Sequence, residues 1–260
     1  MRAARSNAAS AAPRRLTYAR GFTLAEMAVV LVIVALLIAG MMLPLSAQQD
    51  IRARQETEKT LNDIREALVG FAAANGRLPR PAVSAVNGAE NPATCGNDAA
   101  CSGFIPWATL GVHKLDGWNK LVRYSVTPDF ANAPITLTTK AIRTVQTRDH
   151  LGNLSYLVGV DDDPPGGDGI PDCTTPARCA AAVVFSQGRR NWGTNDAGDA
   201  LADESATNVD EDANENGPTN YFSRLPVTDT AAAGGEFDDM VVWLPTTILI
   251  NRMIAAGKLP

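Results

Sequence analysis

The chain has 260 residues, of which 45% are hydrophobic and 20% charged, so it is long enough for one sizeable core besides any targeting segment. Its formal net charge is -5, although Arg2, Arg5, Arg14, Arg15 and Arg20 precede the first acidic residue. The chain beyond these arginines is therefore more acidic still, which disfavours nucleic acid as a partner.

Residues 1–21 form a basic leader, and residues 27–45 that follow contain no charged residue. Nineteen helical residues extend about 28 Å, close to the thickness of the bilayer hydrocarbon, so the sequence predicts a single membrane-spanning helix. The basic flank predicts a cytoplasmic N-terminus and an exported domain after residue 50.

Two ordinary interpretations of the apolar run leave features unexplained. A cleaved secretory signal would fit Pro44 and Ala47, but the run is longer than the usual 7 to 15 apolar residues and Glu26 would lie within it. A plain signal anchor explains the length and the arginines, yet it gives no reason for Glu26 or for the Gly21-Phe22 junction.

The segment "RGFTLAE" at residues 20–26 resembles the processing site of the type IV pilin superfamily, which includes the pseudopilins of type II secretion. The resemblance implies that a prepilin peptidase cleaves after Gly21 on the cytoplasmic side and methylates the new amine of Phe22. It places Glu26 at position five of the mature chain. The sequence departs from the commonest form in its 21-residue leader and in "TLAE" for "TLIE".

The resemblance also implies a role for Glu26 in assembly, with other pilins or pseudopilins as partners. When subunits stack their apolar helices into a filament, the Glu26 carboxylate can pair with the Phe22 amine of a neighbour. Removing one partner of a buried pair costs about 3 to 5 kcal/mol, so we expect the pair to set the axial register.

Residues 22–45 are thus expected to form the transmembrane or filament-core helix, and residues 46–78 its amphipathic continuation. The continuation places apolar residues at helical spacing and ends at Asn75-Gly76, before Pro79. The stripe that we expect to face the core consists of Leu61, Ile64, Leu68, Phe71 and Ala72.

Residues 79–260 are predicted to form the periplasmic globular domain. Short segments rich in β-branched and aromatic residues predict strands, and residues 246–256 predict a final helix capped by Gly257. A helix followed by strands indicates an α+β fold, in which an antiparallel sheet covers the apolar stripe, in agreement with the pilin fold that the resemblance implies. The predicted strands are residues 121–126, 135–138, 141–146, 154–160, 181–186 and 240–244.

Four cysteines fall into two similar pairs, Cys95 with Cys101 and Cys173 with Cys179. Five intervening residues are unlike the usual zinc-ligand spacing, and an exported domain favours disulfides that pin loops. We expect two local bridges, although four cysteines allow three connectivities and a four-thiolate metal site is an alternative.

Two acidic segments are candidates for binding Ca2+, because carboxylate and amide oxygens are its preferred ligands. The segment "VDDDPPGGDGIPDC" crowds five aspartates among turn residues, and its "DGIPD" centre resembles thrombospondin type 3 calcium repeats. The segment "DEDANENG" matches the first half of a calcium loop but lacks its closing glutamate, and a solvated acidic turn is the alternative for both. The candidate ligands are Asp161, Asp163, Asp168 and Asp172 in the first segment and Asp212, Asn214 and Asn216 in the second.

The sequence offers little for catalysis. Its histidines are His113 and His150, with Asp149 beside the second, and no nucleophile or phosphate-loop motif accompanies them. Asp238 and Asp239 are adjacent, so on a strand they would point to opposite faces, which is poor geometry for acid-base chemistry.

The sequence therefore predicts a non-enzymatic minor pilin or pseudopilin that is processed, held in the membrane and assembled into a filament for secretion or as part of a pilus-like system. No cofactor other than Ca2+ is expected. A signal-anchored periplasmic binding module or hydrolase is the alternative from another class, and an adhesive minor pilin is a third possibility within the same class.

Overall fold

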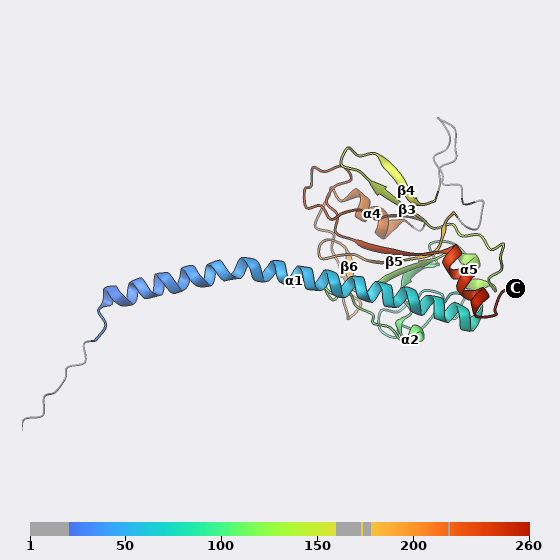
Figure 1. Cartoon of the computed structure of the whole chain (residues 1–260), viewed down its shortest axis with the longest axis horizontal. Helices are drawn as coiled ribbons and strands as arrows, with labels where there is room; N and C mark the ends of the chain where they lie inside the picture. Colours follow the sequence, from blue (N-terminus) through green and yellow to red (C-terminus); the bar gives the residue numbers. More distant parts are fainter. Residues whose placement is uncertain (1–20, 160–172, 174–177, 218) are drawn as a thin grey trace, which may run out of the picture. The chain divides into compact units, whose positions relative to one another are not determined.

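The computed structural model describes residues 21–159, 173, 178–217 and 219–260, with residues 40–46 described by their backbone alone. By its internal contacts the chain divides into two units, Met1–Gln49 and Asp50–Pro260, and we describe each by itself. Helix α1, Leu24–Asn75, contributes residues to both units (Figure 1). The fold combines this N-terminal helix with a mainly antiparallel β structure and two disulfides.

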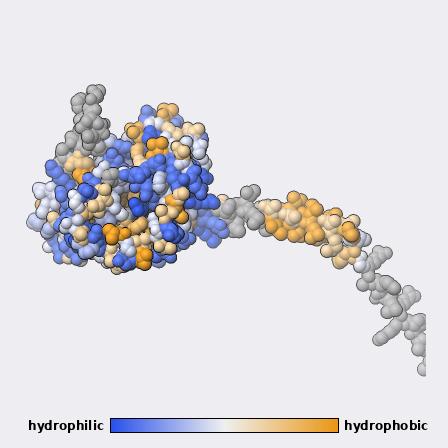
Figure 2. Space-filling view, turned by 180° about the vertical axis from the view of Figure 1, so that it is seen from behind, coloured by the Kyte–Doolittle hydropathy of each residue, from blue (hydrophilic) through white to orange (hydrophobic). Residues whose placement is uncertain are grey.

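In the first unit, α1 is apolar around its whole circumference from Met27 to Ala39. Every described residue from 21 to 39 is exposed in the single chain, with Leu24 at 88% and Leu36 at 68%. Figure 2 shows these hydrophobic side chains gathered along the helix. Among the described residues, no helix combines the length and the hydropathy needed to cross a membrane, which differs from the span that we expected over residues 27–45.

In the second unit, the main sheet has four strands in the order β1-β2-β5-β9, and every neighbouring pair is antiparallel. All seven residues of β5 are buried, which is typical of a central strand that is covered on both faces. The expected strands at residues 121–126, 181–186 and 240–244 are therefore confirmed in this sheet. Its strands are β1 Ser102–Phe104, β2 Arg123–Val126, β5 Ala180–Ser186 and β9 Met240–Pro245.

A second sheet has three strands in the order β4-β3-β8. Its β3·β8 pair is parallel, so the expectation of purely antiparallel pairing is wrong for this pair. The observed β3 overlaps the predicted segment 141–146 but begins three residues later. The strands are β3 Thr144–Arg148, β4 Leu154–Val158 and β8 Asn220–Phe222, and a small third sheet pairs β6 Gly193–Thr194 with β7 Ala200–Leu201.

The predicted strand at residues 135–138 is wrong. Ile135 is buried and donates its N–H to the carbonyl of Gly76, but the threonines that follow bond among themselves. The Thr136 N–H donates to Thr139 Oγ1 at 2.9 Å. Threonine hydroxyls that bond to nearby backbone groups offer an alternative to a sheet ladder, and here this local turn replaces the strand.

The C-terminal half of α1 packs into the main core of the second unit. Leu61, Ile64, Leu68 and Ala72 are fully buried, as the apolar stripe predicts, whereas Phe71 is only partly buried. These side chains share one hydrophobic cluster with residues of β2, β5, β9 and α5, so the helix covers the sheet as expected (Figure 1).

The end of α1 and the final helix also follow the sequence. Helix α1 ends at Asn75, and Gly76 adopts a φ of +75°, as a glycine after a helix end does. Helix α5 spans Thr246–Ala255, and Gly257 has a φ of +69°. The remaining helices are α2 Trp107–Leu110, α3 Pro128–Asn132 and α4 Val209–Asn216, which the sequence analysis did not predict.

The two local disulfides are confirmed, since Cys95 bonds to Cys101 and Cys173 to Cys179. Cys101 is fully buried in the main core. The first loop is also tied to the domain through Asp98, which accepts a bond of 2.7 Å from Nη1 of the fully buried Arg143. The loop closed by this disulfide therefore places the Asp98 carboxylate against the buried guanidinium of Arg143.

Candidate functional site

The first candidate site is the predicted processing junction. Gly21 and Phe22 precede α1 outside regular secondary structure, and Phe22 is 83% exposed. A Cβ added to Gly21 would meet no atom within 4 Å. The fold itself therefore does not require a glycine at position 21, and any such requirement must come from a molecule that binds this segment.

Glu26 lies in the first turn of α1 and forms a reciprocal cap with Thr23. The N–H and the hydroxyl of Thr23 donate to Glu26 Oε2 at 2.8 and 2.9 Å, and the Glu26 N–H donates to Thr23 Oγ1 at 3.2 Å. This is a capping box, in which two helix N–H donors are satisfied together. A glutamate here also interacts favourably with the positive end of the helix dipole.

The second candidate site is a cluster of three buried carboxylates that the sequence analysis did not bring together. Glu211 lies in α4, and Asp238 and Asp239 directly precede β9. One oxygen of each carboxylate lies within 4.8 Å of one oxygen of each of the other two. Their residues are only 3%, 9% and 7% exposed, so these charges are largely removed from water.

Hydrogen bonds hold each carboxylate in place. The Asp238 N–H donates to Glu211 Oε1 at 2.6 Å, and the Arg190 N–H donates to Asp238 Oδ2 at 3.1 Å. Asn214 Nδ2 donates to Asp239 Oδ2 at 2.8 Å. Two segments that are 27 residues apart in sequence are therefore joined by direct bonds around the cluster.

A buried lysine lies beside the cluster but bonds to other groups. Lys120 Nζ donates to four backbone carbonyls in the loop between β5 and β6, at distances from 2.7 to 3.2 Å. Burial lowers the pKa of Lys120, while attraction to Asp238 and other nearby carboxylates opposes this change. The ammonium fixes the loop and contributes one positive charge to the neighbourhood of the cluster.

Burial also shifts the pKa values of the carboxylates. Desolvation raises the pKa of Glu211 and of Asp238, although hydrogen bonds to each partly oppose the rise. The pKa of Asp239 is raised well above its ordinary value by desolvation and by repulsion from Glu211. The main cause in each case is the removal of the carboxylate from water, which disfavours its charged form.

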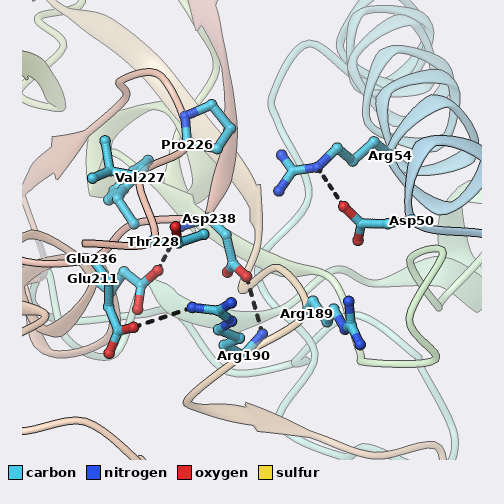
Figure 3. Close-up of a pocket in the computed structure, with 11 residues that line it drawn as sticks. Asp50, Arg54, Arg189, Arg190, Glu211, Pro226, Val227, Thr228, Glu236 and Asp238 are labelled. Atoms are coloured by element: carbon cyan, nitrogen blue, oxygen red, sulfur yellow. Dashed lines mark hydrogen bonds and ion pairs between the residues drawn. The ribbon is translucent and has the colours of Figure 1, made fainter. Parts of the chain in front are cut away.

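A cavity of about 60 Å3 opens beside Glu211 and Asp238 (Figure 3). Its lining is strongly charged, with the Arg54 to Asp50 ion pair at 3.3 Å on one side and the Arg190 to Glu236 pair at 3.4 Å on the other. A cavity of this size has room for water or an ion, but not for a drug-sized ligand.

Of the predicted calcium ligands, the structure describes only the three in the second acidic segment, and it does not bring these three together. Asp161, Asp163, Asp168 and Asp172 lie outside the described residues. The other three, Asp212, Asn214 and Asn216, lie in helix α4 and not in a loop. Successive residues of a helix turn by about 100°, so alternate residues point in nearly opposite directions and cannot converge on one ion.

These three side chains also bond within the protein. Asp212 Oδ1 accepts from Trp192 Nε1 at 2.7 Å, and Asn216 Nδ2 donates to the Asp212 carbonyl at 3.1 Å. Asn214 accepts from the Phe222 N–H at 2.6 Å through Oδ1. The expected calcium loop at Asp212, Asn214 and Asn216 is therefore corrected to a hydrogen-bonded helix.

The "DEDANENG" segment nevertheless contributes Glu211 to the cluster. The interpretation of Asp238 and Asp239 as residues on opposite faces of a strand is wrong, because both precede β9 and reach the same cluster. The sequence signal for this cluster was the presence of several acidic residues near position 211 and again near position 238. Only the pairing of distant segments could show that the two groups meet.

The comparison with known proteins finds a match to one family model. Residues 16–42 match a family model described as the prokaryotic N-terminal methylation motif, and this range contains Gly21, Phe22 and Glu26. No curated protein and no solved structure matches the chain. In its N-terminal segment the chain therefore carries the prepilin-type signal of type IV pilins and pseudopilins.

Proposed function

We propose that this chain is a minor pilin or pseudopilin, processed after Gly21 and assembled into a filament of a type II secretion or type IV pilus-like system. The match of residues 16–42 to the methylation motif is the observation that supports this proposal most directly. In this proposal the protein is a non-enzymatic structural subunit, and its immediate partners are a prepilin peptidase and neighbouring subunits.

The first unit has the surface that such assembly needs. From Met27 to Ala39 the residues of α1 are all apolar, and all are exposed in the single chain. A helix that is hydrophobic on every side is stable only when lipid or other apolar helices surround it. We propose that lipid of the inner membrane surrounds this segment before assembly and that neighbouring helices surround it afterwards.

The geometry at the junction is compatible with processing. Gly21 and Phe22 are exposed and lie before the first helical turn, so a peptidase can reach the bond without unfolding α1. Cleavage would leave Thr23 and Glu26 together on the mature chain, with the capping box intact. Glu26 would then lie one helical turn from the Phe22 amine of its own chain. Its carboxylate would be able to pair with the Phe22 amine of a neighbouring subunit.

The second unit would form the periplasmic domain. It combines the C-terminal half of α1 with an antiparallel sheet, and disulfides are typical of proteins in oxidising compartments. This arrangement supports a pilin-like layout, in which the helix both anchors and assembles the subunit.

The proposal is tested by mass spectrometry of the full chain, recovered from the membrane fraction of cells that contain a prepilin peptidase. We expect a mature chain that begins at N-methylated Phe22. Gly21→Val should stay uncleaved, because the fold has space for the larger side chain and only the peptidase would reject it. Ala28→Val, a matched control inside the motif but away from the junction, should be cleaved normally.

An intact leader on the wild-type chain, or a chain that begins near Gln48, would contradict the proposal. The first result would favour a signal-anchored protein, and the second a secreted protein released by a signal peptidase.

A further inference from the structure

The sequence contains three Asn-Gly pairs, at residues 75–76, 87–88 and 216–217. Asparagine is chemically labile, and a following glycine has no Cβ to hinder attack by its own nitrogen on the side-chain amide carbon. The attack forms a C–N bond within a five-membered imide, and the broken C–N bond releases ammonia, which takes up the glycine N–H proton. Water then opens the imide to aspartate or to isoaspartate. Because the three pairs share these two residues, the structure around each pair decides which one reacts.

The first pair is protected at the end of α1. The Gly76 N–H donates to the Ala72 carbonyl at 2.8 Å. The side chain of Asn75 is engaged too, since its Nδ2 donates to the Phe71 carbonyl at 3.0 Å. Both the attacking nitrogen and the leaving amide must therefore break a hydrogen bond before they react.

The third pair is protected in the same way at the end of α4. The Gly217 N–H donates to the Ala213 carbonyl at 2.8 Å. Asn216 Nδ2 donates to the Asp212 carbonyl at 3.1 Å. Here again the reaction requires the last helical turn to open first.

The second pair lacks this protection. Asn87 is exposed at the end of a turn, and neither its Nδ2 nor the Gly88 N–H donates a hydrogen bond to any described residue. The Ala89 N–H, however, donates to Asn87 Oδ1 at 3.2 Å. A donor at this oxygen stabilises the negative charge that develops on it when the amide carbon is attacked. The pair therefore combines an unbonded nucleophile, an unbonded leaving group and a polarised carbonyl.

We propose that Asn87 is a site of spontaneous deamidation, and that the fold directs the reaction to this asparagine and away from Asn75 and Asn216. The reactants are the Asn87 amide, the Gly88 nitrogen and water, and the product carries one more negative charge than the original chain. This inference does not depend on filament assembly, because every residue that carries it belongs to the second unit.

The modification would disturb a tight contact with α2. Gly88 is buried, and a Cβ added to it would overlap the Trp107 ring. The Gly88 carbonyl also accepts from the Ala108 N–H at 3.0 Å. Isoaspartate lengthens the backbone by one carbon immediately before Gly88, so we expect this contact to loosen and the Ala108 amide to exchange its hydrogen faster.

The test is peptide mass spectrometry of the full chain in detergent micelles, incubated in mildly alkaline buffer made with water enriched in heavy oxygen. The label identifies carboxyl groups formed during the incubation and not during digestion. In the folded chain, Asn87 should deamidate at least about ten-fold faster than Asn75 or Asn216, because hydrogen bonds hold both reacting groups at the other two pairs. In urea the three rates should agree within about three-fold, because unfolding removes these hydrogen bonds.

Two variants separate this site from other sources of acidic species. Asn87→Gln should greatly slow the growth of the acidic species in isoelectric focusing, because glutamine would have to close a less favourable six-membered imide. Asn75→Gln, the matched control at a protected Asn-Gly pair, should form the acidic species as fast as the wild type does.

Three outcomes would overturn the inference. The first is no deamidation of Asn87 in the folded chain while the same residue reacts in urea. The second is a rate at Asn75 or Asn216 in the folded chain that equals or exceeds the rate at Asn87. The third is the same preference for Asn87 in urea, which would show that the local sequence and not the fold selects this residue.

Discussion

Thr23 and Glu26 cap each other at the start of α1, with the hydroxyl and N–H of Thr23 both directed to Glu26 Oε2 at 2.9 and 2.8 Å. Glu26, for which we propose a role in assembly, therefore already has a structural role within its own chain. Capping and charge pairing can be separated experimentally, because the cap needs the hydroxyl of Thr23, whereas the proposed pair with a neighbour's Phe22 amine needs the negative charge of Glu26.

Thr23→Val should loosen the first turn of α1. The change removes the hydroxyl that donates to Glu26 and accepts from its N–H, and the loss of such a cap costs about 1 kcal/mol. Hydrogen exchange of the amides in the first turn should become about five-fold faster. Thr23→Ser keeps the hydroxyl and should exchange like the wild type, and equal rates for all three chains would show that the cap has no effect.

Glu26→Gln should be processed but not assembled. Glutamine can still occupy the last position of a capping box, so the change removes the charge while it preserves the local structure. An unpaired amine in a filament core costs about 3 to 5 kcal/mol, so incorporation should fall at least 100-fold. Cross-linking of purified filaments measures incorporation, and mass spectrometry of the same sample checks cleavage. Normal incorporation of Glu26→Gln would contradict a role for the charge.

Gly188→Ala should destabilise the second unit more than Gly76→Ala does. Both glycines have positive φ, +57° and +75°, so alanine causes backbone strain of about 1 to 2 kcal/mol at either position. At Gly188 the added methyl group would also overlap Asp238 Oδ1, whereas at Gly76 it would meet no atom within 4 Å. Urea unfolding of the two variants should show an additional loss at Gly188 of about 1 to 3 kcal/mol. Equal losses would show that the Asp238 carboxylate moves aside at little cost.

Asp98→Asn should lower stability because Asp98 pairs with a fully buried arginine. Arg143 Nη1 lies 2.7 Å from Asp98 Oδ1, and the Arg143 side chain is completely buried while that of Asp98 is one-third exposed. Loss of a fully buried pair costs about 3 to 5 kcal/mol, so for this partly exposed pair we expect about 2 kcal/mol in urea unfolding. Asp129→Asn, at an exposed position in α3, should change the free energy of unfolding by less than about 0.5 kcal/mol.

Glu90→Gln should lower stability at neutral pH but not in strong acid. Burial alone would raise the pKa of Glu90, but bonds from the Arg77 guanidinium and the Arg80 N–H outweigh it and lower the pKa below its ordinary value. A carboxyl with a lowered pKa stabilises the fold above its unfolded-state pKa and loses this contribution as pH falls through the folded-state pKa. The pair is partly exposed, so we expect a loss of about 1 kcal/mol at pH 7.

Urea unfolding of the wild type and Glu90→Gln at pH 7 and near pH 3 tests this expectation. The difference between the two chains should shrink as the pH falls below about 4.5, the ordinary pKa of a glutamate. A difference that is constant with pH would show that the glutamate acts through its shape and not through its charge.

Local sequence patterns were sufficient to predict the elements whose structure depends on residues close together in the chain. The apolar spacing of Leu61, Ile64 and Leu68 predicts the buried face of α1, and Asn75-Gly76 predicts its end. The methylation motif is likewise a short contiguous segment, so residues 16–42 alone reveal it. The central strand β5 was predictable because small, β-branched and aromatic residues fill it without a charged residue, a glycine or a proline.

Tertiary structure decided the features that depend on distant segments. Residues 212–216 look like part of a calcium loop in sequence, but bonds from Asn214 to Phe222 and Asp239 favour a helix. Residues 135–138 have strand composition, yet local threonine hydrogen bonds form a turn instead.

What the sequence by itself determined was the prepilin-type N-terminus, the course of α1 and the local disulfides, because each is encoded within a few consecutive residues. What only the tertiary structure decided was the meeting of Glu211 with Asp238 and Asp239, because chain segments 27 residues apart must fold together before their charges interact. Carboxylate interactions depend on distance in space and on exclusion of water, and neither can be read from the order of residues.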